Sequence, residues 1–121
     1  MINTDENKVY PASNDFVGWM DLGCNGFNKD FYRTKRLLLQ SGLSLSIQAS
    51  SGHYCSPRKN AECETYAMYY EFEIGFPSQK IDKLMQYAEQ PDEPTETVYG
   101  FVPKSLIKEI IDDNGGVVGL C

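Results

Sequence analysis

The segment LSLSIQAS, residues 43–50, alternates apolar and polar side chains along its whole length. Leu43, Leu45, Ile47 and Ala49 stand at every second position, with serine or glutamine between them. A period of two residues is that of a β-strand with one face in the core and one face toward solvent. The segment therefore predicts a strand with one buried face.

A second strand is predicted at residues 66–76, YAMYYEFEIGF, which is rich in the aromatic side chains that strands favour. Every second residue from Tyr66 to Phe76 is aromatic or aliphatic and shares one face, while Glu71 and Glu73 point to the other face. We expect the two strands to be antiparallel neighbours, with the long loop between them at one end of the sheet.

A helix is predicted next, in PSQKIDKLMQYAEQP, residues 77–91. Ser78 stands where an N-cap is needed, and Pro91 and Pro94 end the segment. The apolar residues have the i, i+3, i+4, i+7 spacing of one helix face. These residues are Ile81, Leu84, Met85 and Ala88.

Residues 95–102, TETVYGFV, predict a third strand, and Pro103 suits the first position of a last helix. That helix carries a row of leucine and isoleucine residues and stops at the sequence Asn-Gly-Gly, residues 114–116. Residues 41–116 thus predict the order β-loop-β-α-β-α. This is an α+β fold, with a small antiparallel sheet and two helices packed on one face.

The first 40 residues are less regular. Residues 1–15 are polar and predict a tail or an ordered extension, and residues 16–31 mix aromatics with glycines in the manner of an irregular packed segment. Residues 29–40 fit a short helix or a strand equally well. With 121 residues in all, the chain is expected to form a single domain, residues 1–121.

Composition predicts a soluble cytoplasmic protein. Hydrophobic residues make up 41% and charged residues 23%, and no apolar run is long enough to span a membrane. The N-terminus lacks the basic and apolar regions of a secretion signal. The four cysteines are therefore expected to be reduced thiols rather than a disulfide framework.

The formal net charge of −6 argues against non-specific binding to DNA, RNA or anionic membranes. A small anion remains possible because the basic residues are clustered. The two clusters are RTKR, residues 33–36, and RK, residues 58–59.

The loop between the first two strands, SGHYCSPR, concentrates reactive side chains. His53, Cys55 and Cys63 lack the paired spacing of a structural zinc site, so no metal and no cofactor are predicted. His53 and Cys55 also lack an identifiable orienting partner for nucleophilic catalysis. Glu71 and Glu73 are assigned to a solvated or subunit-facing surface.

An anionic, nucleotide-like ligand explains more of the sequence. CSPR, residues 55–58, joins a proline-stiffened loop to a hydroxyl and a guanidinium, which grips phosphate through two parallel hydrogen bonds. FPSQK, residues 76–80, and YGFVPKS, residues 99–105, each place aromatic residues before a predicted helix N-terminus, a position that favours anions. Phosphates and a stacking base match this combination.

Four phrases resemble the phage-encoded Thoeris anti-defence proteins of the first-described type. They are LSLSIQASSGHYCSPR, YEFEIGFPS, MQYAEQPDEPTETVYGFVP and NGG, and the likeness covers residues 43–116. The resemblance implies a non-enzymatic sponge in the host cytoplasm. Such a sponge sequesters glycocyclic ADP-ribose (gcADPR), the signal made by the TIR-domain enzyme of the defence system.

The resemblance also implies a homo-oligomer of dimers with the ligand enclosed between protomers, and some family members bind cyclic oligonucleotides at a second site. It places seven residues in the ligand site, and Arg33 and Arg36 join them on charge alone. The seven are His53, Tyr54, Ser56, Arg58, Phe76, Ser78 and Tyr99.

Two other functions stay open. One is an enzyme that cleaves a cyclic nucleotide signal, with His53 as acid or base and Cys55 assisting. The other is an inhibitor that binds a host defence enzyme through an acidic face.

Overall fold

The structure, a computed structural model, describes residues 9–121. Two helices of more than one turn, two 3₁₀ helices and five strands make up the regular structure. The helices are α1 (Phe16–Gly23) and α2 (Lys104–Asp113), and the 3₁₀ helices are Tyr66–Met68 and Asp82–Tyr87. The strands are β1 (Leu37–Leu39), β2 (Ser44–Gln48), β3 (Glu71–Gly75), β4 (Val98–Pro103) and β5 (Val117–Leu120).

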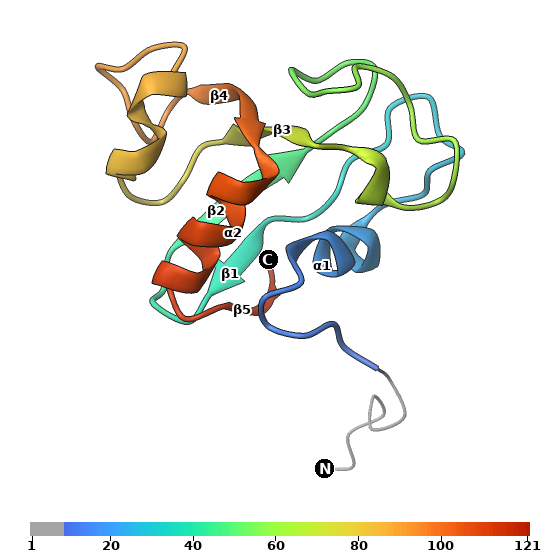
Figure 1. The fold of residues 1–121 in the computed structure, drawn as a ribbon, viewed down its shortest axis with the longest axis horizontal. Coiled ribbons are helices and arrows are strands. Elements are labelled where there is room, and N and C mark those ends of the chain that lie inside the picture. The colour runs from blue at the N-terminus through green and yellow to red at the C-terminus, as the bar shows by residue number, and fades with distance from the viewer. Residues whose placement is uncertain (1–8) are drawn as a thin grey trace.

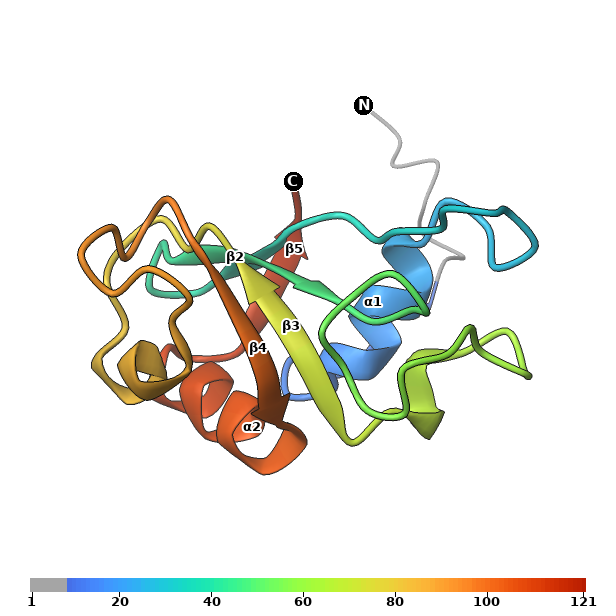
Figure 2. The same cartoon turned by 90° about the horizontal axis from the view of Figure 1, so that it is seen from above.

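The five strands form one sheet in the order β4-β3-β2-β1-β5, and all neighbouring pairs are antiparallel. Both α1 and α2 pack on the same side of this sheet (Figures 1 and 2). The predicted α+β fold is therefore confirmed, although one of the two helices is not the one expected. None of the helices among residues 9–121 combines the length and apolarity needed to cross a bilayer.

The predicted antiparallel pairing of the two central strands is confirmed, but the second strand is shorter than the predicted 66–76. It spans residues 71–75, and residues 66–68 form a 3₁₀ helix instead. Ile47 of β2 lies opposite Ile74 of β3, and both side chains are fully buried. Phe72 is buried on the same face and meets Phe16 of α1 edge-on, with ring centroids 5.3 Å apart. Burying these side chains under the two helices is the main stabilisation of the fold.

The predicted helix at residues 77–91 is wrong. Ser78 does not cap a helix, because it is hydrogen-bonded to Ser44 at the start of β2. Its N–H donates to the Ser44 carbonyl at 2.8 Å, and its Oγ accepts the Ser44 N–H at 2.9 Å. Only the 3₁₀ helix Asp82–Tyr87 follows, and its residue Leu84 is buried. Ala88 then bridges to Tyr99 of β4, so pairing with the sheet ends the helical segment.

The sequence interpretation missed α1. The Asp15 carboxylate caps this helix by accepting the Gly18 N–H at 2.9 Å, and Phe16, Trp19 and Met20 are buried at helical spacing. Position 18 requires glycine, because a Cβ there would lie only 2.5 Å from Oδ2 of the capping Asp15 carboxylate. The glycines that suggested an irregular segment thus accommodate a capped helix.

Two short strands complete the sheet. Residues 37–39 of the ambiguous segment form β1, and residues 117–120, for which no element was predicted, form β5 beside it. Val117 also donates its N–H to the Ser13 carbonyl at 2.7 Å, so residues 9–15 include an ordered extension. Residues 1–8 of the predicted tail lie outside the described part of the chain.

Buried tyrosines fix the long segment between β2 and β3 to the core. The hydroxyls of Tyr32 and Tyr69 are 2.7 Å apart, and Tyr69 donates to the Lys59 carbonyl at 2.6 Å. Tyr32 accepts the Ala61 N–H at 2.9 Å. Burial raises the pKa of Tyr69, so its hydroxyl remains a donor at neutral pH.

Helix α2 ends where predicted, at Asn114 and two glycines. Gly116 has a φ of +90°, and an ideal Cβ there would lie only 2.8 Å from the Ser13 Cβ. Both features exclude a larger residue, so this glycine permits the turn from α2 into β5.

Replacing Gly116 with alanine should lower the free energy of unfolding by about 1–2 kcal/mol from the left-handed backbone, with the clash adding to it. Gly119→Ala is the matched control, because an added Cβ there meets nothing within 4 Å. We expect the control to stay within about 0.5 kcal/mol of the wild type. Urea unfolding of both variants tests this, and equal stabilities would contradict it.

Candidate functional site

The face of the sheet opposite α1 and α2 carries a groove of about 200 Å³, which we call the polar groove. Its floor comes from the solvent-facing positions of β2, β3 and β4, and its walls come from the segments around residues 33, 53 and 76. It is lined by Arg33, Ser46, Gln48, His53, Glu73, Gly75, Phe76 and Val98.

The register of the strands explains the shape of the floor. Ser46 lies opposite Gly75, and Gly75 lies opposite Val98, so a row of three small residues crosses the sheet. Gln48 and Glu73 face each other in the next row. The small row leaves room above the sheet, and the polar row beside it supplies hydrogen-bonding groups.

Two carboxylates of β3 hold the loop that forms one wall. Glu73 Oε2 accepts the Tyr54 N–H at 3.0 Å, and Glu71 Oε1 accepts the Ser56 hydroxyl at 2.6 Å. Ser56 also donates its N–H to the Glu71 carbonyl at 3.1 Å. These glutamates, assigned from sequence to a solvated or subunit-facing surface, are partly buried and anchor the loop.

His53 is held by its own turn. Its Nδ1 lies 2.7 Å from Ser50 Oγ, which accepts the Gly52 N–H at 3.1 Å. Burial lowers the pKa of His53, the Glu73 charge opposes this, and the charges of Arg33 and Arg58 add to the lowering. The ring is therefore neutral at pH 7, with Nε2 left for a ligand.

Cys55 is not exposed to the groove. Its side chain is buried, with Sγ 3.2 Å from the Ser50 carbonyl, and burial raises the pKa of the thiol. A protonated, buried thiol is a weak nucleophile. Cys63 lies exposed, and no group of three or more candidate metal ligands occurs among residues 9–121.

Arg33 provides the free positive charge of the groove. Its backbone is pinned to Asn25, which accepts the Arg33 N–H through Oδ1 at 3.0 Å and donates its own N–H to the Arg33 carbonyl at 3.0 Å. Its exposed guanidinium forms no ion pair with any residue in the range 9–121. The positive charge is thus available to an anion from outside.

Arg36 has a different role. One guanidinium nitrogen, Nη2, donates to the Phe76 carbonyl at 2.8 Å and to Ser44 Oγ at 3.0 Å. Phe76 has a φ of +48°, which is uncommon for a bulky residue. Arg36 therefore helps to hold the backbone that turns the Phe76 ring toward the polar face.

This turn corrects the predicted orientation of Phe76. The alternation placed it with Phe72 and Ile74, whereas its ring is 48% exposed and lines the polar groove. Phe101 repeats the feature with a φ of +55°, where the pairing of β3 and β4 is irregular. Both phenylalanines leave the core because their backbone conformation breaks the alternation.

A second aromatic group stands beside the groove. The rings of Tyr54 and Phe101 are 5.9 Å apart, and the Arg58 guanidinium lies 5.0 Å from the centre of the Tyr54 ring. Phe101 donates its N–H to the Tyr54 carbonyl at 2.9 Å, which ties this group to β4. Val98 lines both the polar groove and the shallow hollow bounded by these two rings.

The structure brings Arg33, His53 and Phe76 into one groove from three distant parts of the chain. Tyr54 and Arg58 lie against each other beside the groove. The hydroxyls of Ser56 and Ser78 and the guanidinium of Arg36 form hydrogen bonds within the protein. Tyr99 does not reach the groove: it is fully buried and donates its hydroxyl to the Pro94 carbonyl.

Sequence analysis missed the floor of the groove. Ser46 and Gln48 occupy polar positions of a correctly predicted strand, and Glu73 has the equivalent position in the next one. The polar positions of the two predicted strands could have indicated the groove, because antiparallel pairing brings the polar residues of neighbouring strands side by side.

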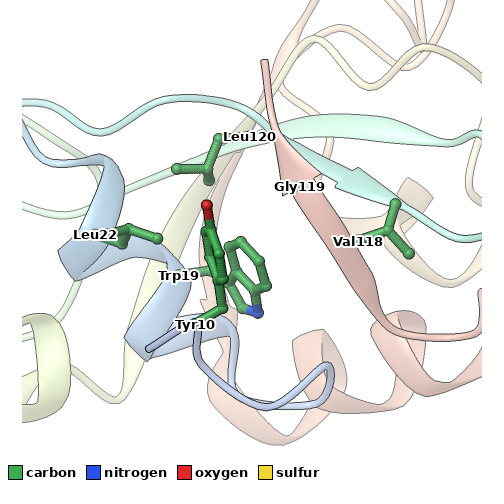
Figure 3. A pocket seen from close by; sticks show the side chains of 6 residues that line it. All are labelled: Tyr10, Trp19, Leu22, Val118, Gly119 and Leu120. Carbon is green, nitrogen blue, oxygen red and sulfur yellow. The ribbon is translucent and has the colours of Figure 1, made fainter. Parts of the chain in front are cut away.

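A wider groove of about 340 Å³ lies at the β5 edge of the sheet (Figure 3). Tyr10 and Trp19 stack there with ring centroids 5.9 Å apart, and Leu22, Val118 and Leu120 surround them. Among residues 9–121, no charged side chain lines this groove. The described residues therefore offer an anion no counter-charge here, and the polar groove is the candidate site.

Comparison of the chain with protein-family models, with curated proteins and with solved structures finds no match.

Acidification should destabilise the protein partly through His53. Its pKa in the folded state is lower than the ordinary 6.5, so the stability that it contributes is present above about pH 6.5 and is lost as the pH falls through the folded-state pKa. Melting at about pH 7.5 and about pH 5 should show a smaller loss for His53→Gln than for the wild type.

The direct measurement is an NMR titration of the imidazole, which is unambiguous because the chain has one histidine. A pKa at or above 6.5 would contradict the prediction.

Proposed function

We propose that this protein binds gcADPR and sequesters it without cleaving it, as an anti-defence protein in the host cytoplasm. The observation that carries the proposal is the meeting of a free guanidinium, a neutral imidazole and an exposed aromatic ring around one groove, in Arg33, His53 and Phe76. The ligand offers a pyrophosphate, two riboses and an adenine, for which these groups are suitable partners.

Arg33 is the expected partner of the pyrophosphate. A planar guanidinium forms two parallel hydrogen bonds to phosphate oxygens, and this one has no competing carboxylate bound to it. His53 lies on the same groove and can donate a further hydrogen bond from Nε2. A local cation, Arg33, thus supports anion binding by a chain with a net charge of −6.

Phe76 is the expected partner of the adenine. Phe76 is 48% exposed and lines the groove together with the small row of Ser46, Gly75 and Val98. Stacking of a base on such a ring contributes about 1–3 kcal/mol. Glu73 can accept hydrogen bonds from an amino or hydroxyl group of the ligand.

Binding is favoured over cleavage by the state of the reactive side chains. The buried Cys55 thiol has a raised pKa and the His53 pKa is lowered, so at neutral pH Cys55 is not a thiolate nucleophile and His53 is not protonated to act as a general acid. The close contact of Ser50 with His53 belongs to a turn, because Ser50 is buried and also accepts the Gly52 N–H.

Self-association is part of the proposal. The polar groove, at about 200 Å³, is smaller than the roughly 300–1,000 Å³ typical of whole-ligand pockets. No helix among the described residues covers this face of the sheet. A second copy placed over it would enclose the ligand and strengthen the arginine–phosphate contact by excluding water. The family resemblance extends the proposal to cyclic oligonucleotides at a second site.

Incubation with gcADPR, removal of free ligand and heat denaturation should release intact gcADPR at close to one molecule per site. Chromatography of the released material is the measurement. A cleaved product formed in excess over protein, and abolished in His53→Ala, would instead show an enzyme. Absence of any nucleotide together with co-purification of a host protein would indicate an inhibitor.

Arg33→Ala should weaken gcADPR binding by about 2 kcal/mol or more, since a hydrogen-bonded charge pair is lost. Lys108→Ala is the matched control: it removes one positive charge from α2, on the opposite side of the sheet. Calorimetry with both variants separates a local contact from an effect of net charge. Equal affinities for the two variants would remove Arg33 from the site.

A further inference from the structure

A second hollow of about 230 Å³ adjoins the polar groove and shares two of its residues, Arg33 and His53. We call it the Asp30 hollow. Beyond the shared pair it is lined by Asp30, Phe31, Tyr32 and the turn of residues 50–52. Arg33 and His53 therefore stand between two adjoining spaces rather than at the end of one.

The size of the two spaces suggests that they hold parts of one ligand. Whole small-molecule pockets measure about 300–1,000 Å³, and each of these spaces is below that range. A pyrophosphate bound to Arg33, on the boundary, leaves room for a different ligand group on each side. The groups on the Asp30 side must then match the chemistry of that hollow.

That chemistry differs from the chemistry of the polar groove. Within residues 9–121, no hydrogen bond or ion pair engages the Asp30 carboxylate, and the hydroxyl-bearing residue Ser51 lines the same hollow. The Phe31 ring is 83% exposed and provides an apolar wall. A carboxylate repels phosphate but accepts two hydrogen bonds from neighbouring hydroxyls. The hollow therefore suits a neutral sugar with one apolar face.

We propose that the Asp30 hollow is a ribose subsite in which the Asp30 carboxylate accepts hydrogen bonds from a free vicinal diol, an inference that rests on the proposed function. A carboxylate that bonds ribose hydroxyls is a familiar solution in nucleotide-binding proteins. The ribose C–H face packs on Phe31, and Arg33 holds the adjoining pyrophosphate.

This assignment makes Asp30 a specificity residue. In gcADPR the adenosine ribose uses a secondary hydroxyl for ring closure, so only the other ribose keeps a free vicinal diol. A cyclic oligonucleotide has none, because every ribose uses a secondary oxygen for its phosphodiester. The Asp30 hollow thus favours cyclic ADP-ribose signals over cyclic oligonucleotides in this groove.

The test is a calorimetric cycle with two ligands and three proteins. The ligands are gcADPR and its dideoxy analogue, in which both hydroxyls of the free diol are replaced by hydrogen while the adenine and the pyrophosphate are retained. The proteins are the wild type, Asp30→Asn and the control Asp112→Asn. The control makes the same charge change on α2, on the other side of the sheet.

For intact gcADPR we expect Asp30→Asn to bind about tenfold more weakly than the wild type, and Asp112→Asn to match the wild type. For the dideoxy analogue, Asp30→Asn and the wild type should bind equally. Any loss caused by a change in ligand conformation affects both proteins and cancels in the cycle.

The outcomes separate the two proposals. Failure of the wild type to bind gcADPR would overturn the proposed function and the ribose subsite together. Tight wild-type binding that Asp30→Asn leaves unchanged, or reduces equally for both ligands, would overturn the subsite alone.

Discussion

The candidate site depends on the hydrogen bonds between the glutamates of β3 and the loop that follows β2. Glu71 and Glu73 point away from the core and bond Ser56 and Tyr54 across the polar face of the sheet. Backbone hydrogen bonds from Ser56 to Glu71 and from Phe101 to Tyr54 hold the same loop against the sheet. The buried tyrosine hydroxyls secure the later part of the same segment, so both of its ends are tied to regular structure.

The two central strands were predictable because the sheet is covered on one face only. Apolar residues therefore alternate with polar ones in the sequence, just as buried residues alternate with partly exposed ones in the structure. Arg33 was selected on charge alone, and His53 and Phe76 through the family resemblance. Each was a separate candidate, since their convergence depends on folding. Tyr99 was misplaced because an aromatic residue beside a helix start was taken as exposed, whereas β4 turns it into the core. Helix α1 was missed because its glycine pattern hid a regular cap.

The alternation of buried and exposed side chains fails at Phe76 and Phe101, the two phenylalanines whose backbone is in the left-handed region. Phe76 and Phe101 are exposed, and a hydrogen bond stabilises the backbone of each. The Phe76 carbonyl accepts a hydrogen bond from Arg36, and the Phe101 N–H donates to the Tyr54 carbonyl. Such conformations persist only when the surroundings determine them. In this protein the surroundings are the groove and its neighbouring aromatic group, which are the parts most relevant to a ligand.

The mixture of charges around the groove has a kinetic consequence. Arg33 and Arg58 stand near Glu71 and Glu73 on a chain of net charge −6, so a distant anion meets no attractive field. Encounters are then unsteered, with association rate constants on the order of 10⁵–10⁶ M⁻¹s⁻¹ and little dependence on ionic strength. A molecule retained here would owe its residence time to slow escape alone.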